Sequence, residues 1–233
     1  MRVLIACEES QAVCIAFRNI GIEAYSCDIQ ECSGGHPEWH IKGDAIKEAY
    51  SGKYDLMIAH PPCTDLAVSG ASHFEQKRMD GRQQQSIVFF MKLVNAPIRH
   101  IAVENPVCIM SSIYRKPDQI IHPYYFGDNV PKKTCLWLKN LPKLFYQLEN
   151  DLFGIKTSVD PEYAIYNSKK TISGKSKYSV LGTLGTGHGK ERSKTFQGVA
   201  TAIAEQWGAY LLSTKQNSMN LPEIATNFNF YNQ

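Results

Sequence analysis

The sequence has no apolar run long enough to cross a membrane, because no segment approaches the roughly 20 apolar residues of a transmembrane helix. Its first apolar segment stops at Glu8 and Glu9, which makes it too short for a secretory signal peptide. The seven cysteines show no regular pairing pattern, which favours thiols that pack or react over a disulfide framework. We therefore expect a soluble, cytoplasmic protein without a membrane partner.

A large charge surplus is also absent, since 25 basic and 22 acidic residues leave a net charge of +3. The basic residues are unevenly distributed, however. Between residues 164 and 198 a single acid, Glu191, is accompanied by Lys169, Lys170, Lys175, Lys177, Lys190, Arg192 and Lys194. Such a basic stretch suits a polyanion such as nucleic acid, and a solvated lysine-rich loop is the alternative.

The hydrophobic pattern predicts an α/β fold. The chain has 233 residues and 43% hydrophobic content, enough for one full-sized domain. Five apolar stretches predict strands: Val3–Ala6, Ala24–Cys27, Leu56–Ala59, Ile98–Val103 and Cys135–Leu138. Helical spacing of apolar residues predicts three helices: Glu9–Ile20, Gly81–Asn95 and Gly198–Leu212. Strands that alternate with helices predict a doubly wound, mostly parallel sheet.

Four segments follow from this pattern. Residues 1–140 form the α/β core, and residues 141–191 form a small, irregular, basic insertion with at most one hairpin. Residues 192–212 contain a helix that returns to the core, and residues 213–233 form a loosely ordered tail.

Two strand ends deliver reactive residue types. The strand at Leu56–Ala59 is followed by His60-Pro61-Pro62-Cys63, whose prolines stiffen the chain and prevent an immediate helix. Cys63 should therefore lie at the carboxyl edge of the sheet, as a nucleophile or as one more buried thiol. The next strand ends in Glu104, whose pKa we expect burial to raise so that it holds a proton. A structural pair with a nearby lysine is the alternative for Glu104.

A nucleotide-like ligand is suggested by the first strands. The first strand ends in small and polar residues, although the glycine-rich pattern G-x-G-x-x-G is missing. Asp28 follows the second strand, where an acid suits ribose hydroxyls, and Asp44 precedes a helix, where it is placed to contact an adenine amine. Each acid alone also fits a helix cap or a surface position.

The pair of motifs, Pro61-Pro62-Cys63 and then Glu104-Asn105, resembles those of the DNA (cytosine-5)-methyltransferases, in a short form with a reduced target recognition region. The resemblance covers roughly residues 1–140 and 192–212. It implies a Rossmann-like methyltransferase fold in which Cys63, presented by Pro62, attacks C6 of a flipped cytosine. Glu104 would then engage N3, with Asn105 as its structural neighbour.

The same resemblance implies S-adenosyl-L-methionine as cofactor and double-stranded DNA as partner, in DNA methylation such as that of restriction–modification. The residues that it places at the cofactor are Ala6, Cys7, Glu8, Ser10, Asp28, Asp44 and Pro61. The residues that it or the basic charge places at DNA are Thr64, Ser69, Gly70, Lys132, Lys133, Lys175, Lys177, Lys190 and Arg192.

Two other functions stay open. An amino-methyltransferase acting on adenine or cytosine nitrogen also has a Pro-Pro dipeptide after this strand, although His60 replaces its usual Asn, Asp or Ser. A relative that binds cofactor or DNA without turnover is the second, motivated by the first turn without glycine and by lysines where the family has arginines. No metal is expected, because the spacing of Cys27, Cys32, His36 and His40 differs from common zinc sites.

Overall fold

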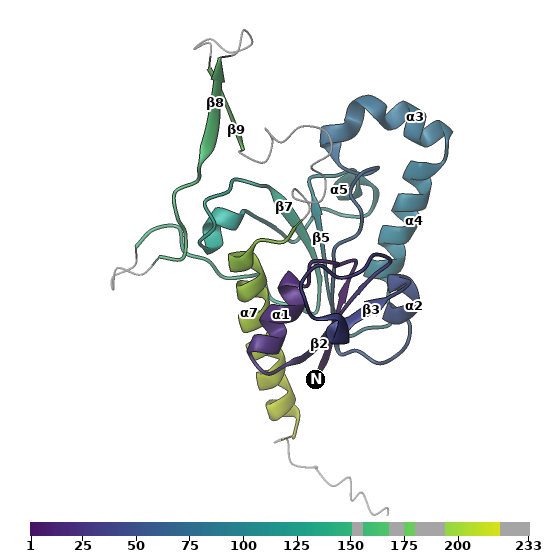
Figure 1. Cartoon of the computed structure of the whole chain (residues 1–233), viewed down its shortest axis with the longest axis vertical. Coiled ribbons are helices and arrows are strands. Elements are labelled where there is room, and N and C mark those ends of the chain that lie inside the picture. The colour runs from purple at the N-terminus through teal and green to yellow at the C-terminus, as the bar shows by residue number, and fades with distance from the viewer. Residues whose placement is uncertain (151–155, 168–174, 180–193, 220–233) are drawn as a thin grey trace, which may run out of the picture.

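The computed structural model describes residues 1–150, 156–167, 175–179 and 194–219, and a seven-stranded sheet forms its centre (Figure 1). The strands are β1 (Arg2–Ala6), β2 (Glu23–Asp28), β3 (His40–Lys42), β4 (Leu56–Ala59), β5 (His100–Pro106), β6 (Gln119–Ile121) and β7 (Thr134–Lys139). Their order in the sheet is β3-β2-β1-β4-β5-β7-β6. The first five strands in this order are parallel to one another, and β7 is antiparallel to both of its neighbours, β5 and β6. This Rossmann-like, mostly parallel α/β sheet confirms the predicted fold class.

Helices cover both faces of the sheet. They are α1 (Ala12–Asn19), α2 (Ala45–Ala49), α3 (Phe74–Met79), α4 (Arg82–Val94), α5 (Met110–Ile113) and α7 (Gln197–Met219), with 3₁₀ turns η1 (Pro37–Trp39), η2 (Val68–His73) and η3 (Pro123–Phe126). Figure 1 shows α1 and α7 side by side, away from α2 and α4. The sheet is thus wound on both sides, which leaves its carboxyl edge open between the loops.

The central strands are continuously apolar because they are buried on both faces. In β1, Val3 and Ile5 pack in the core beneath α1 and α7, whereas Leu4 and Ala6 pack in the core beneath α4. Successive strand residues point to opposite faces, so one short apolar run serves two cores. This register fixes which residues emerge at the carboxyl edge.

Helix α7 ties the end of the described chain to the core. It starts at Gln197, close to the predicted start, and continues to Met219, past the predicted end at residue 212. Trp207 is fully buried, and its indole N–H donates to the carbonyl of Pro142 at 2.9 Å. The first seven residues of the predicted tail are therefore helical, and residues 220–233 lie outside the described chain.

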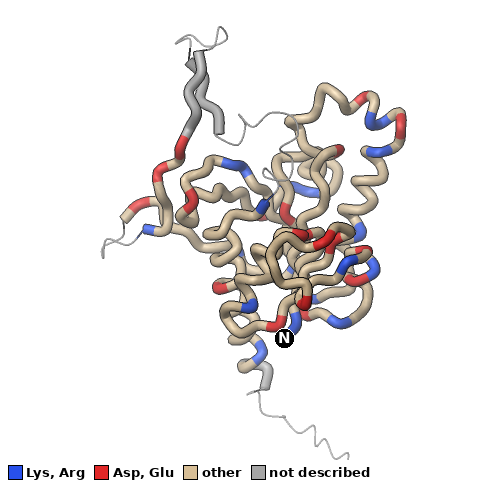
Figure 2. The backbone as a smooth tube through the Cα atoms, in the orientation of Figure 1, with Lys and Arg blue, Asp and Glu red and all other residues tan. Residues whose placement is uncertain are grey.

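The basic insertion contains one antiparallel hairpin, β8 (Tyr163–Asn167) with β9 (Lys175–Ser179), as the sequence allowed. Figure 1 shows this hairpin projecting away from the seven-stranded sheet. In Figure 2, acidic and basic positions stand side by side around the junction of α3 and α4. Within the described residues, no helix is long and apolar enough to span a membrane. The segment boundaries remain predictions.

Candidate active site

The ends of β4 and β5 bring the two predicted motifs together. The strands pair in parallel with Ala59 opposite Val103, so the residues that follow them meet at the same edge. Asn105 is 1% exposed, and its side-chain amide donates to the carbonyl of Pro61 at 2.8 Å. This hydrogen bond attaches the proline segment to β5 and fixes the position from which Cys63 is presented.

Cys63 begins a tight turn at this edge. Its carbonyl accepts hydrogen bonds from the N–H groups of Leu66 at 3.0 Å and Ala67 at 2.8 Å. The thiol residue is partly exposed, unlike the buried cysteines Cys14, Cys27, Cys108 and Cys135. An accessible, geometrically fixed thiol is what a nucleophile needs, and a core thiol would be covered.

The loop after Cys63 is anchored at both ends. Val68 donates its N–H to the carbonyl of Val107, and Ile109 donates to that of Leu66, each at 3.1 Å. Lys77 of α3 is buried; its ammonium donates to the carbonyl of Thr64 and lies 3.5 Å from Asp65 Oδ1. Sequence reasoning missed Lys77, because a single lysine in a polar helix carries no signal of burial.

The predicted DNA-contacting residues of this loop fall on its outer side. Thr64 and Ser69 are exposed, and Gly70 is partly exposed. Lys133 is exposed as well, whereas Lys132 is partly buried and lies beside Glu104. Lys175 and Lys177 belong to β9, where the side chains are not described, and Lys190 and Arg192 lie outside the described residues.

Glu104 forms an ion pair with His60 across the two strand ends. Its Oε2 lies 3.1 Å from His60 Nδ1, and the side chains are only 17% and 11% exposed. Burial raises the pKa of Glu104, but the hydrogen bond from His60 and the charge of Lys132 outweigh burial and hold that pKa below the ordinary value. The expectation of a raised pKa for Glu104 is therefore wrong, because it omitted these two partners.

His60 received no catalytic role from the sequence. Burial lowers the pKa of its imidazole, but the hydrogen bond and charge of Glu104, with the charge of Glu8, outweigh burial and raise the pKa overall. The available signal was a histidine placed directly before two prolines at a strand end. The site thus holds an imidazole in contact with a carboxylate that favours its charged form.

Glu8 has a structural position that differs from its predicted cofactor role. Its carboxylate is 4% exposed and accepts hydrogen bonds from the N–H groups of Val13 at 2.7 Å and Cys14 at 3.2 Å. It satisfies otherwise unpaired donors in the first turn of α1. The carboxylate is therefore directed into the helix end and toward the charge of His60.

A hollow of about 380 Å³ lies beside the proline segment, at the carboxyl ends of β1, β2 and β4. Its lining residues are Cys7, Asp28, Ile29, Gln30, Gly43, Asp44, Ala45, Pro62, Asp65, Arg82, Gln85, Ser86 and Phe89. Three predicted cofactor residues, Cys7, Asp28 and Asp44, line it, whereas Ala6, Glu8, Ser10 and Pro61 do not. The contribution of α4 was missed, because its amphipathic pattern indicates only a helix against a core.

The acids at this hollow also shape the local chain. Asp44 Oδ1 accepts from the N–H of Ile46 at 2.8 Å and caps α2, as the alternative interpretation proposed. Asp28 Oδ1 accepts from the N–H of Gln30 at 2.9 Å. Both carboxylates are thereby held at the rim, where two acids beside the apolar ring of Phe89 suit a nucleoside.

The cysteine- and histidine-containing segment after β2 is a loop packed over α1. Buried Gln11 donates its side-chain amide to the carbonyl of His36 at 2.8 Å and accepts from the His36 N–H at 3.1 Å. A Cβ on Gly34 would lie 2.5 Å from the Cβ of Gln11, so only glycine fits there. Among the described residues, no three His, Cys, Asp or Glu side chains gather as metal ligands.

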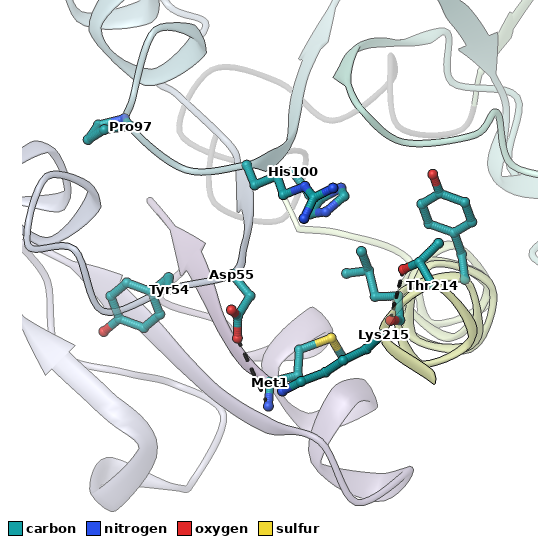
Figure 3. Close-up of a pocket in the computed structure, with 10 residues that line it drawn as sticks. Met1, Tyr54, Asp55, Pro97, His100, Thr214 and Lys215 are labelled. Carbon is teal, nitrogen blue, oxygen red and sulfur yellow. Dashed lines mark hydrogen bonds and ion pairs between the residues drawn. The ribbon is translucent and has the colours of Figure 1, made fainter. Parts of the chain in front are cut away.

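A larger cavity of about 430 Å³ lies at the amino ends of β4 and β5, facing α7 (Figure 3). Tyr54, Asp55, His100 and Lys215 are among its lining residues, and none of the predicted site residues is. Parallel α/β sheets bind ligands at the carboxyl ends of their strands. The smaller hollow beside Pro62 therefore remains the candidate site.

Comparisons with known proteins add little to this geometry. No model of a known protein family matches the chain, and no curated protein matches it. One matching solved structure is a prophage-encoded E. coli protein, provisionally described as a DNA modification methyltransferase. The chains are 15% identical, with a TM-score of 0.44 over 69% of this chain and 52% of the other, so this chain spans about half of that protein's length. A match at this level carries no argument about activity.

Proposed function

We propose that the protein is an S-adenosylmethionine-dependent DNA methyltransferase that transfers a methyl group to C5 of cytosine. The observation that carries this proposal is the joining of a partly exposed Cys63 and an ionisable Glu104 at one sheet edge through the Asn105–Pro61 hydrogen bond. An amino-methyltransferase needs neither the thiol nor the carboxylate. Double-stranded DNA is the proposed partner, with the basic insertion, residues 141–191, supplying phosphate contacts.

The residues beside Pro62 fit the proposed cofactor. Asp28 and Asp44 would hold its ribose hydroxyls and adenine amine, and Phe89 and Ile29 would contact the apolar surface of the base. When bound, S-adenosylmethionine supplies a methyl group activated by a sulfonium. Pro62 lines the same hollow and directly precedes Cys63, so cofactor and nucleophile would meet at one point of the chain.

The chain's own residues would make C5 reactive. Cytosine C5 is a poor nucleophile while the ring is conjugated, and addition of the Cys63 thiolate to C6 removes that conjugation. Glu104 would engage N3 and deliver the proton that stabilises charge there. After methylation, loss of the C5 proton to a base or water lets the thiolate leave and restores the ring. Because duplex DNA hides both atoms, the target base must leave the stack.

The test is trapping of a covalent complex. The protein is incubated with S-adenosylmethionine and duplex DNA containing 5-fluorocytosine, whose fluorine blocks loss of a proton at C5. We expect a denaturation-resistant adduct with the wild type and none with Cys63→Ser. Cys32→Ser is the matched control, because Cys32 is also partly exposed but lies in the loop after β2. An adduct that persists in Cys63→Ser, or no adduct in the wild type, would overturn the proposal.

A further inference from the structure

The pair formed by His60 and Glu104 extends the proposed function by one residue. We propose that His60 is a positioning residue that orients Glu104 and stores the proton which, through Glu104, reaches N3 of cytosine. The inference rests on the proposed function, since N3 is the acceptor that it requires.

The backbone fixes the two side chains relative to each other. His60 follows β4, and its N–H donates to the carbonyl of Ala6 at 2.9 Å. Glu104 lies within β5, and the neighbouring Asn105 is bonded to Pro61. Because both attachment points are part of the sheet edge, the 3.1 Å contact between Nδ1 and Oε2 is held by the fold and not by two flexible side chains.

The contact leaves Glu104 one oxygen for a substrate. Within the described part of the chain, hydrogen bonding to Glu104 is through Oε2 alone, so Oε1 is available to a ring nitrogen. A carboxylate that takes the proton from Nδ1 becomes a neutral carboxyl, and rotation of that group then presents the O–H to a second base. The arrangement resembles a relay in which Glu104 stays an anion before and after transfer.

Three charged groups from different elements face His60. Glu104 comes from β5, Glu8 from the segment after β1, and Lys132 from the segment before β7. The two carboxylates favour the imidazolium and Lys132 opposes it, and the net effect is a raised pKa of His60. The raised pKa favours a protonated His60, and the lowered pKa of Glu104 favours an ionised carboxyl.

The second ring nitrogen of His60, Nε2, has a different environment from Nδ1. His60 Nε2 is buried, and it has no hydrogen-bond partner among the described residues. A buried N–H without an acceptor makes the imidazolium costly to keep. Loss of the proton from Nδ1 leaves the Nε2–H tautomer, so this N–H stays buried without an acceptor in the neutral imidazole as well.

The proton and charge balance follows directly. The Cys63 thiol first loses its proton to solvent, and the thiolate then bonds to C6, so that negative charge develops on the ring. The proton first moves from His60 Nδ1 to Glu104 Oε2, which gives a neutral imidazole and a neutral carboxyl. Rotation of this carboxyl presents the same O–H to N3, and its transfer forms the N3–H bond and leaves Glu104 anionic. When the thiolate departs, N3 returns the proton along the same path.

The first test reads the ion pair without any turnover. Carbon-13 labelling of histidine followed by NMR titration gives the pKa of His60 in the wild type and in Glu104→Gln. We expect the wild-type midpoint to lie above the ordinary value of 6.5 and to fall in the variant. A midpoint at or below that value, or one that Glu104→Gln leaves unmoved, would overturn the proposal.

The second test reads the proton transfer. His60→Gln keeps a hydrogen-bond donor for Glu104 but has no proton to give, so the single-turnover rate of methylation should fall about 10²-fold or more. The wild-type rate should decline as pH rises through the pKa of His60, and this limb should vanish in the variant. DNA affinity should be unchanged. His100→Gln is the control, since His100 is a buried histidine at the opposite end of β5.

The outcomes separate the two proposals. A wild-type protein that forms no 5-fluorocytosine adduct would overturn the proposed function and the role of His60 together. An active wild type beside a His60→Gln variant with the same rate and pH profile would overturn the role of His60 alone. If His60→Gln does not fold, the NMR comparison of the wild type with Glu104→Gln decides.

Discussion

At the scale of single residues, the proposed reaction depends on the charge state of Glu104. A carboxyl that carried its own proton would match the usual picture of a buried general acid. Here His60 and Lys132 outweigh the effect of burial and lower the pKa of Glu104, while Glu104 raises the pKa of His60. We therefore regard the two residues together as the proposed proton donor, and neither residue alone.

The pair adds to folding stability only while both partners are charged. Because the pKa of Glu104 is lowered, its contribution is complete above the ordinary value of 4.5 and is lost as pH falls through the folded value. Because the pKa of His60 is raised, its contribution is complete below 6.5 and is lost as pH rises through the folded value.

We therefore expect the difference in unfolding free energy between wild type and Glu104→Gln to be largest between about pH 4.5 and pH 6.5. This difference should decrease as pH falls below 4.5 and as pH rises above 6.5. Urea unfolding of both proteins from acidic to alkaline pH measures it. A difference that does not vary with pH would show that the two groups are not an ion pair in solution.

At the scale of elements, helix α7 is joined to the core through its first turn. The N–H of Gly198 donates to Asp128 Oδ2 at 2.9 Å, and a Cβ at this position would lie only 1.9 Å from the backbone carbonyl oxygen of Phe126. The first turn of the returning helix thus contains a glycine required by a close backbone approach. Phe196, two residues earlier, lies over Lys132 beside Glu104.

Gly198→Ala should lower the free energy of unfolding by at least the ~1–3 kcal/mol typical of overpacking, because the backbone at Phe126 must shift. Gly208→Ala in the same helix is the matched control. Its Cβ would meet the flexible end of Ile22 at 2.8 Å, and alanine gains about 1 kcal/mol of helix propensity there. Urea unfolding compares the variants, and equal losses would contradict the role of the first turn.

The elements were more predictable than the contacts between them. Each predicted strand has a counterpart in the sheet, because the strands are short apolar runs bounded by turns. The short strands β3 and β6 were missed, since three residues carry too little pattern. The antiparallel direction of β7 and the contact of His60 with a residue 44 positions away depend on topology and register, which local patterns do not encode.

At the scale of the whole molecule, two cavities lie at opposite edges of one sheet. The hollow beside Pro62 is lined by three aspartates and the ring of Phe89, and the cavity in Figure 3 lies between the amino ends of the strands and α7. The doubly wound topology assigns ligand binding to the first of them. Binding of the proposed cofactor at this hollow can therefore be tested without DNA.

S-adenosylmethionine at about 100 times its Kd should stabilise the protein by about 2.7 kcal/mol, or roughly 5–10 °C in Tm. Asp28→Asn should remove most of this shift, because it weakens the grip on the ribose. Asp55→Asn, in the opposite cavity, should retain it. Thermal unfolding with and without the cofactor measures all three proteins, and the reverse pattern would move the cofactor to the other edge.

The central claim concerns which atom of DNA receives the methyl group. The most direct measurement is mass spectrometry of nucleosides after duplex DNA has been incubated with the protein and S-adenosylmethionine carrying a labelled methyl group. The account predicts labelled 5-methyldeoxycytidine, which disappears with Cys63→Ser and persists with Cys32→Ser. Label on an exocyclic amine of cytosine or adenine, or unmodified DNA beside a protein that binds the cofactor, would contradict it.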